Sequence, residues 1–372
     1  MEDRIYDYWV ATLQDGYLGD IVNMVSGAGG ARAFYALSVA GLVRKCKITE
    51  RLAGYIEENR PDIRSVEENY YRMQERGIHY VNHTDNDFPE KLRNILGRPY
   101  GLFVKGSLPD PSVPAVAIVG ARQCSEYGRL MAQFFGSRLA QEGVQVISGM
   151  AAGIDGIAQE SAVGAGGRSF GVLGCGVDIF FPIKNRLLYK KLCDNWNGLI
   201  SEYAPGTPAE ARRFPPRNRI ISGLCDVLIV VEARKKSGTL INVDMAIDQG
   251  RTVMVVPGRL TDNLSAGCIN LLYQGALPAT GVEAVLEQLG VNRQMELSDL
   301  STPSFVKDGK VIPKEQTSVL DVMKIEPQSI DQIAERAEIS PDQAMIMLTR
   351  LEIEGLVREV YPGYYIRQLE LA

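Results

Sequence analysis

The spacing of apolar residues divides the chain into three parts. In residues 1–70, apolar positions recur at helical intervals in short segments, which glycine-rich breaks such as Ser26-Gly-Ala-Gly-Gly30 separate. The predicted helices span residues 5–13, 18–25, 31–37 and 48–59. We therefore expect a small helical domain of the SAM or helix-hairpin-helix kind. Its glycine hairpin is a candidate contact to a nucleic-acid backbone, but only Arg32 lies near it, and helix packing is the simpler interpretation.

From residue 113, apolar β-branched runs alternate with longer amphipathic segments. The predicted strands are residues 116–119, 144–147, 169–173, 227–231 and 252–256. This alternation is typical of parallel sheets, and continuous apolar runs suit strands that helices cover on both faces. We therefore predict an α/β chain whose central domain, residues 71–290, is a doubly wound, Rossmann-like sheet. Ligands of such sheets bind beyond the carboxyl ends of the strands.

The last part of the chain predicts a separate small domain. Residues 291–314 are polar and broken by two prolines, which indicates a linker. In residues 315–372 the pattern predicts three helices, the second and third capped by Ser329 and Ser340, and then a hairpin that turns at Pro362-Gly363. Three helices and a hairpin are the layout of a winged-helix domain.

Composition narrows the class of protein. With 372 residues, 45% of them hydrophobic and 23% charged, the chain is ordinary globular material with room for two or three folding units. Its start is acidic, and no apolar run approaches the ~18 residues of a membrane span, so we expect a cytoplasmic protein without membrane contact. Six scattered cysteines and only two histidines argue against a zinc site, a Ser-His-Asp triad or any metal cofactor.

The formal net charge of −5 is unevenly distributed. Residues 313–372 hold 6 lysines and arginines against 11 aspartates and glutamates, so the rest of the chain balances at 34 of each. Within that neutral part, residues 205–240 hold 7 cationic side chains against 3 carboxylates. Salt screens charges beyond about 8 to 10 Å, so attraction is local. A polyanion can therefore bind this segment although the whole chain is acidic.

Turns that follow the predicted strands carry the candidate chemistry. Small residues there leave backbone amides bare, and helix starts direct amides toward an anion. The first turn, residues 120–128, has the position of a phosphate loop but neither the dinucleotide-binding nor the P-loop glycine spacing, so a plain tight turn is the alternative. The predicted phosphate- or strand-binding residues are Gly120, Arg122, Ser125, Gly149, Gly153, Lys184, Asn185, Arg217, Asn218, Arg219, Ser237, Gly238 and Thr239.

Several candidates in these turns have two interpretations. Phe180 and Phe181 precede Lys184, a combination that suits a stacked single strand, but phenylalanines are usually core residues and lysines usually solvated. If residues 214–224 are helical, Arg217 and Arg219 point to different sides. We then expect one of them to contact ligand while the other braces Glu232 or Asp155. Asp155 itself is predicted to hold its turn, since no partner for acid catalysis is visible.

These motifs together resemble the DNA-processing protein A family, also called DprA or Smf. The resemblance rests on an ordered set: Gly120-Ala-Arg, Ser148-Gly, Gly153-Ile-Asp155, Ser201-Glu-Tyr203, Arg217-Asn-Arg-Ile-Ile-Ser-Gly223, Val231-Glu-Ala233, Ser237-Gly-Thr-Leu240 and Val256-Pro-Gly258. It implies a homodimeric, non-enzymatic mediator that binds and protects incoming single-stranded DNA and loads the recombinase RecA during natural transformation. Arg122 matches the family's phosphate-contacting arginine, and Lys184 lies where a DNA-contacting lysine is expected.

The chain departs from the family pattern at two places. Gln159 stands where members commonly have histidine, and Leu240-Ile-Asn-Val243 stands where they commonly read Leu-Ile-Thr-Ala. Neither change removes a charge, so we expect binding to survive with altered pocket geometry. The third predicted helix of the winged-helix domain, residues 341–354, offers only Arg350 against three carboxylates. We expect it to repel DNA, which leaves a protein-contact or regulatory role, or simple stabilisation of the chain end.

Two other classes of function compete with this interpretation. A nucleotide-processing enzyme of the phosphoribohydrolase type uses the same kind of sheet, but it needs Pro-Gly-Gly-x-Gly-Thr near a catalytic glutamate. The chain instead offers Glu232-Ala-Arg-Lys-Lys-Ser-Gly-Thr239. A protein adaptor whose basic surface meets an acidic partner is the other alternative.

Overall fold

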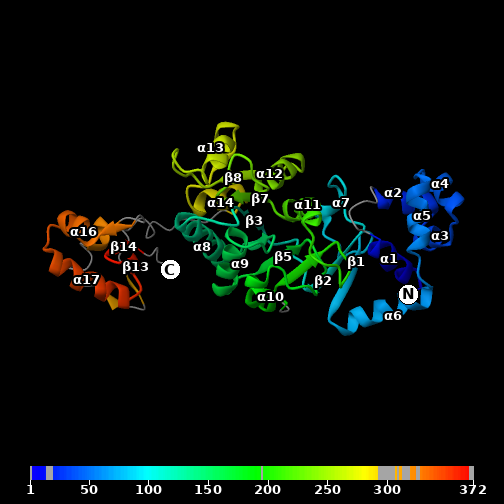
Figure 1. Ribbon diagram of the computed structural model, residues 1–372, viewed down its shortest axis with the longest axis horizontal. Coiled ribbons are helices and arrows are strands. Elements are labelled where there is room, and N and C mark those ends of the chain that lie inside the picture. The colour runs from blue at the N-terminus through cyan, green and yellow to red at the C-terminus, as the bar shows by residue number, and fades with distance from the viewer. Residues whose placement is uncertain are drawn as a thin grey trace. The chain divides into compact units, whose positions relative to one another are not determined.

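The computed structural model describes residues 2–13, 20–193, 196–291, 306–307, 310–311, 319–323 and 327–367. The chain forms two compact units, Met1–Val291 and Asn292–Ala372, which are described separately (Figure 1). The predicted linker over residues 291–314 lies outside the described residues, except for Val291 and two short strands, β10 (Val306–Lys307) and β11 (Lys310–Val311), which pair antiparallel.

A nine-stranded sheet runs through the larger unit in the order β1-β2-β6-β5-β4-β3-β7-β8-β9. Its strands are β1 (Ile78–Asn82), β2 (Gly101–Gly106), β3 (Ala115–Val119), β4 (Gln145–Ser148), β5 (Ser169–Leu173), β6 (Gly198–Ser201), β7 (Val227–Val230), β8 (Thr252–Val255) and β9 (Leu277–Pro278). The strands from β6 to β9 pair in parallel, whereas β1 and β2 extend the sheet antiparallel. The predicted doubly wound α/β architecture is confirmed.

The order of the parallel strands reverses between β3 and β7. From β3 the chain adds β4, β5 and β6 on one side, and then returns to add β7, β8 and β9 on the other. Parallel strands all end at the same edge of the sheet, and the loops at such a reversal diverge to opposite faces. The fold therefore opens a crevice beyond β3 and β7.

Helices cover both faces of the sheet (Figure 1). The alternation of side chains along β3 shows this: Val116 and Ile118 belong to one apolar cluster, while Ala117 and Val119 belong to another. The first cluster contains buried side chains of α8, α9 and α14, and the second contains buried side chains of α11, α12 and α13, so the two groups of helices cover opposite faces. The bounds are α8 (Glu126–Gln141), α9 (Ile154–Gly164), α10 (Arg186–Leu192), α11 (Phe214–Leu224), α12 (Thr239–Asp248), α13 (Ala266–Tyr273) and α14 (Val282–Gln288).

Six helices precede the sheet and share a core with it. They are α1 (Glu2–Thr12), α2 (Ile21–Ala28), α3 (Ala31–Ala36), α4 (Val39–Cys46), α5 (Glu50–Glu58) and α6 (Ile63–Glu75), with α7 (Glu90–Arg93) between β1 and β2. Trp9 and Phe34 of the helices lie in the same apolar cluster as Tyr80 and Phe103 of the sheet. A domain boundary at residue 70 stays a prediction. The amphipathic pattern did not predict α4 or α6.

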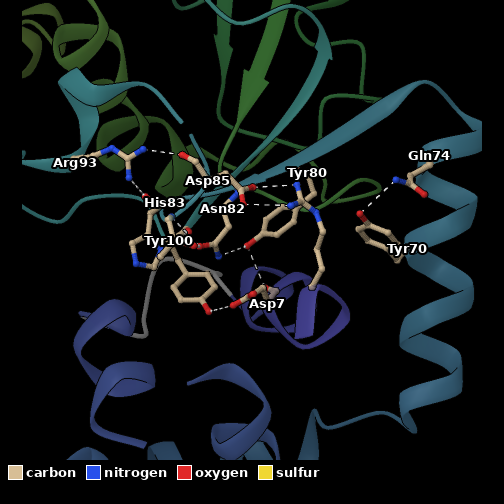
Figure 2. A network of polar contacts seen from close by, with 11 residues as sticks. Asp7, Tyr70, Gln74, Tyr80, Asn82, His83, Asp85, Arg93 and Tyr100 are labelled. Atoms are coloured by element: carbon tan, nitrogen blue, oxygen red, sulfur yellow. Dashed lines mark hydrogen bonds and ion pairs between the residues drawn. The ribbon is translucent and has the colours of Figure 1, made fainter. Parts of the chain in front are cut away.

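The free edge of β1 is covered by polar side chains. Because alternate residues of an edge strand direct their backbone groups away from the sheet, Tyr80 and Asn82 expose theirs. The Arg4 guanidinium donates to the Tyr80 carbonyl oxygen at 2.7 Å and pairs with Asp85 at 3.0 Å. The Asp85 carboxylate accepts from the Asn82 amide at 2.8 Å (Figure 2). These contacts occupy groups that would otherwise pair with another chain.

Asp7 joins α1 to strand β1 and to Tyr100, the residue that precedes β2 (Figure 2). The Tyr100 hydroxyl donates to the Asp7 carboxylate, and the Tyr80 hydroxyl donates to the Asp7 carbonyl oxygen at 3.1 Å. His83 packs on Tyr100 with ring centroids 5.1 Å apart, and its Nδ1 lies 3.0 Å from the Tyr100 carbonyl oxygen. Burial raises the pKa of Asp7 and lowers the pKa of His83, because it disfavours the charged form of each.

The smaller unit confirms the predicted winged-helix arrangement. Residues 319–322 are helical, and they are followed by α16 (Ile330–Ala337), α17 (Pro341–Ile353) and a three-stranded sheet of β12 (Gln328–Ser329), β14 (Tyr364–Arg367) and β13 (Val357–Tyr361). Ser329 and Ser340 each form a complete capping box, as predicted. The first of the three predicted helices spans residues 317–325, of which residues 317–318 and 324–325 lie outside the described residues.

No described helix in either unit has the length and apolar character needed to cross a membrane.

The partly buried environment of His83 predicts that the stability of the larger unit depends on pH. Because the pKa of His83 is lower in the folded state, protonation favours unfolding, and the stability of the larger unit falls as pH drops below about 6.5. Asp7 acts in the opposite sense at lower pH, because its raised pKa favours the protonated folded form. We expect His83→Gln to reduce the difference in melting temperature between pH 7.5 and pH 5.5. Tryptophan fluorescence reports this unit, since both tryptophans lie in it.

His79→Gln is the matched control, because His79 lies in β1 but its side chain is exposed. The charged groups around His83 are Asp7, Arg93 and Arg98. An unchanged difference in the His83 variant, or an equal change in both variants, contradicts the assignment of this pH dependence to His83.

Candidate functional site

A cavity of about 570 Å³ lies at the point where the strand order reverses. Its wall is formed by the turn after β3, by residues that follow β4, by the first turn of α11, and by the segment that joins β7 to α12. The volume is within the usual range for ligand-binding clefts of about 300 to 1,000 Å³.

The turn after β3 places one exposed arginine at the cavity. Gly120 packs so closely on Ile154 that a side chain there would overlap it, with a Cβ only 2.7 Å from the Ile154 side chain. Arg122 is exposed, and it forms no ion pair with any residue that the structure describes. Its guanidinium lies 5.9 Å from the centre of the Phe214 ring. Arg122 is therefore available to a ligand.

Ser125 begins α8 and is fully engaged there. Its hydroxyl accepts from the Gly128 amide at 3.1 Å, as expected of a helix cap, and donates to the Glu232 carboxylate. The Ser125 amide donates to Glu232 at 3.0 Å. Glu232 is 2% exposed and does not line the cavity. The glutamate that the nucleotide-processing alternative requires is thus a buried acceptor for the first turn of α8.

A buried pair of opposite charges supports the inner wall. The Asp155 carboxylate accepts from the Gly149 amide at 3.2 Å, so this residue holds its turn, as predicted. Arg217 donates to the Gly149 carbonyl oxygen at 2.9 Å and to the Val172 carbonyl oxygen. Burial lowers the pKa of Arg217 to about 10 and raises the pKa of Asp155, while each charge partly offsets the effect on the other. Arg217 therefore stays charged at neutral pH.

Arg219 faces away from this cavity. Its guanidinium donates to both oxygens of Glu202, at 2.6 and 2.7 Å, and to the Gly97 carbonyl oxygen at 2.7 Å. The two arginines do point to different sides of α11, as expected. The prediction that one of these arginines pairs with Glu232 or Asp155 was wrong for Arg219, because its carboxylate partner is Glu202. Sequence spacing could not identify this partner, since Glu202 follows a strand that had not been predicted.

The segment between β7 and α12 adds cations that the list of predicted site residues lacks. Arg234 and Lys236 line the cavity and form no ion pair within the described ranges. The Thr239 hydroxyl donates to the Gly120 carbonyl oxygen at 3.2 Å, which ties this segment to the turn after β3. In the sequence, Arg234 and Lys236 were indicated only by the cationic excess of residues 205–240. The sheet order is what shows that this segment lies beside Arg122.

Lys184 belongs to a short helical turn, η1 (Ile183–Asn185), that adjoins the cavity. The Asn185 amide donates to the carbonyl oxygens of Met150 and Ala151 at 2.9 and 3.0 Å, and Ala151 lines the cavity. Lys184 is exposed, but it is not part of the lining. Phe181, which precedes this turn, is 43% exposed and packs on the cavity residue Phe214 with ring centroids 5.4 Å apart.

The predicted residues thus fall into two groups. Those that line the cavity are Gly120, Arg122, Arg217, Asn218, Ser237, Gly238 and Thr239. Those outside its lining are Ser125, Gly149, Gly153, Lys184, Asn185 and Arg219. No group of three or more histidine, cysteine or acidic side chains that could hold a metal ion occurs in the described parts of the chain. The cavity combines exposed cationic side chains, a buried arginine and turns of small residues whose backbone amides are accessible. These features suit the binding of an anion such as phosphate.

A doubly wound sheet with a cationic cavity at its reversal point defines a Rossmann-like protein. Residues 79–290 match the family model described as DNA recombination-mediator protein A, and residues 312–361 match the DprA winged helix domain. The chain belongs to the DNA recombination-mediator protein A family, known as DprA or Smf.

Characterised relatives agree with this assignment. Protein Smf of Escherichia coli is 33% identical over 305 residues, which cover 82% of this chain and 81% of the relative. The DNA processing protein DprA of Streptococcus pneumoniae is 40% identical over 204 residues, which cover 55% of this chain and 72% of the relative.

Two solved structures share the architecture. DNA processing protein A from Streptococcus pneumoniae superposes with a TM-score of 0.66 at 29% identity, over 77% of this chain and 97% of that one. DNA processing protein A from Helicobacter pylori, whose structure describes a single-stranded DNA binding mode, gives a TM-score of 0.51 at 26% identity, over 57% and 95% of the two chains.

The pairing of Arg219 predicts a structural role that a matched arginine lacks. The side chains of Arg219 and Glu202 are only 14% and 11% exposed, so Arg219→Ala removes the guanidinium that binds both oxygens of a poorly solvated carboxylate. We expect the variant to lower the free energy of unfolding by about 2 to 3 kcal/mol. Arg212→Ala removes a pair whose members are 42% and 41% exposed, so it should leave the free energy of unfolding nearly unchanged.

Urea unfolding followed by tryptophan fluorescence measures both variants. An equal decrease in the free energy of unfolding in the two variants would contradict a stabilising role specific to the Arg219–Glu202 pair.

Proposed function

We propose that this chain binds single-stranded DNA along the cavity and acts as a recombination mediator. In this role it protects incoming single strands and loads RecA during natural transformation. The observation that carries the proposal is the set of exposed cations around the cavity, in a chain of the recombination-mediator family. The related Helicobacter pylori protein, whose structure describes a single-stranded DNA binding mode, supports the choice of ligand.

The electrostatics of the cavity favour a chain of phosphates. Arg122, Arg234 and Lys236 lie on its wall, and each is exposed and without an ion pair in the described ranges. Lys184 adds a cation on the adjoining turn. A single phosphate needs one or two such contacts, whereas cations spread over three segments suit successive phosphodiesters.

One carboxylate, Asp155, lies in the wall of the cavity. It is 7% exposed, and its neighbours are the Gly149 amide and the buried Arg217. The nearby guanidinium weakens its repulsion of an anion. Binding of a polyanion therefore remains favourable at neutral pH.

Exposed aromatic rings beside the cations suit single strands in particular. Phe180 and Phe181 are 41% and 43% exposed, and the Arg186 guanidinium lies 5.5 Å from the centre of the Phe180 ring. Unpaired bases stack on such rings regardless of their sequence. We infer a homodimer as the functional form, because two cavities on one strand raise the effective concentration of the second contact. Strands long enough to reach both subunits should then bind more tightly.

The winged-helix unit has a different place in this proposal. Asp342, Glu352 and Glu354 lie on or beside α17, where DNA-reading domains present basic side chains. Met345 and Ile346 of the same helix are 48% and 56% exposed. An acidic helix with exposed apolar residues suits a protein contact, so we assign this unit to protein contacts or regulation rather than to the DNA.

Replacing Arg122 or Lys184 tests the binding site. We expect Arg122→Ala and Lys184→Ala each to weaken binding to oligo-dT by roughly 5- to 10-fold at low salt. Each should also lower the slope of log affinity against log salt by about 0.7, because one phosphate contact is lost. Fluorescence anisotropy at two or more salt concentrations measures both quantities.

Arg51→Ala is the control, because Arg51 is an exposed arginine on α5, far along the chain from the cavity residues. Unchanged affinity and slope for both site variants reject this site. A gel shift that compares single- with double-stranded DNA, with free nucleotides as competitors, separates a strand binder from a nucleotide-processing enzyme. Hydrolysis of a nucleoside monophosphate that Glu232→Ala abolishes supports the enzyme, and RecA capture that needs neither DNA nor Arg122 supports an adaptor.

A further inference from the structure

Asn242 gives the cavity wall a hydrogen-bonding group that the protein leaves unused. It lies in the first turn of α12, lines the cavity and is only 7% exposed. Its Oδ1 atom is fully buried and accepts no hydrogen bond from any described residue. Such an oxygen has lost its water and gained no donor, and most buried polar atoms avoid this state. Because Asn242 lines the cavity, rotation of its side chain would present this oxygen to a donor that enters from the cavity.

A phosphate cannot supply this donor. Phosphodiester oxygens only accept hydrogen bonds, so they satisfy Arg122 and Lys236 but not the oxygen of Asn242. The cavity also has apolar walls, to which Phe214, Ile241 and Leu264 contribute. An apolar and aromatic wall beside an unpaired amide suits a flat ring that carries N–H groups. The nucleobase is the part of a DNA strand with this chemistry.

The amide of asparagine matches every base when the base is unpaired. On its Watson–Crick edge each base has an N–H donor next to an acceptor: N6 and N1 in adenine, N4 and N3 in cytosine, N1 and O6 in guanine, N3 and O4 in thymine. An amide offers the complementary pair, an accepting Oδ1 and a donating Nδ2. Rotation of the amide by 180° reverses their order, so one side chain can pair with each base. In a duplex these edges are already occupied.

This inference rests on the proposed function and adds a source of strand selectivity. We propose that Asn242 pairs through its amide with the Watson–Crick edge of one unpaired base in the cavity. The contact favours single-stranded over duplex DNA without reading the sequence. The cations hold the backbone, which both forms of DNA share, and Asn242 recognises what only the single strand exposes.

The test compares two ligands that carry the same phosphates. One is oligo-dT, and the other is an abasic oligomer of equal length. We expect Asn242→Ala to weaken binding of oligo-dT by about 5-fold, the effect of one lost hydrogen-bonded contact, and binding of the abasic oligomer by less than about 2-fold. Its salt slope should stay at the wild-type value, because no charge is removed. Arg122→Ala should weaken binding of both ligands.

Gln141→Ala is the matched control, since it removes an exposed amide from the last residue of α8, about 24 Å along that helix from Ser125. It should change neither affinity. The fold should tolerate Asn242→Ala, because alanine favours helices and the change removes an unpaired buried oxygen. If that variant melts below the wild type, Asn242→Leu, which keeps the branched shape of the side chain, replaces it in the same comparison.

The outcomes separate this inference from the proposed function. Equal losses on oligo-dT and the abasic oligomer, or no loss on oligo-dT, overturn the pairing by Asn242 while strand binding stands. A loss confined to one of the four homopolymers overturns its independence of sequence. If the wild-type protein binds neither oligomer, the proposed function fails and the pairing fails with it.

Discussion

The candidate site depends on the parallel pairing of β3 with β7. Val116 lies opposite Val227, and at the start of the two strands Ala115 and Asp226 bind each other twice: the Asp226 amide donates to the Ala115 carbonyl oxygen at 2.8 Å, and the Ala115 amide donates to the Asp226 carboxylate at 3.0 Å. This register makes both strands end at the same level. Their exit turns then meet, and segments that are far apart in the sequence form one cationic wall.

The cationic side chains of α11 and of the segment after β7 differ in burial and in how many of their donors the protein uses. Arg217 and Arg219 are held by carbonyl oxygens and by a carboxylate on another segment, so their charges stabilise the packing of α11 against neighbouring strands. Arg234 and Lys236 follow β7 directly and stay exposed. A cation inside the fold is costly unless its donors are used, whereas an exposed cation keeps its donors for a ligand.

The antiparallel extension of the sheet serves a different purpose. Strand β1 and the segment that joins it to β2 carry the polar network that fixes α1 through Asp7 and covers the sheet edge through Arg4 and Asp85. The cationic cavity lies at the reversal point between β3 and β7, several strands away. The fold thus separates the polar groups that hold the first helices from those that line the cavity.

The sequence by itself determined the alternation of strands and helices, the winged-helix layout and the position of the turns that follow the strands. Apolar runs such as residues 227–231 and caps such as Ser329 are local signals, and the structure agrees with them. The short strand β6 was missed because only two of its four residues, Leu199 and Ile200, are strongly apolar. The first helices were found only in part. Helices α4 and α6 were missed although α6 buries Val66, Tyr70 and Met73 at helical spacing, so the local signal was present there.

Only the tertiary structure decided which candidates share a surface. Strand order and register, which no local pattern encodes, placed Arg234 and Lys236 beside Arg122 and turned Arg219 toward Glu202. The unused oxygen of Asn242 has the same origin, because hydrogen bonding in a cavity wall depends on every segment that packs there. Local sequence fixes what a residue can do chemically, and long-range packing fixes which group it meets.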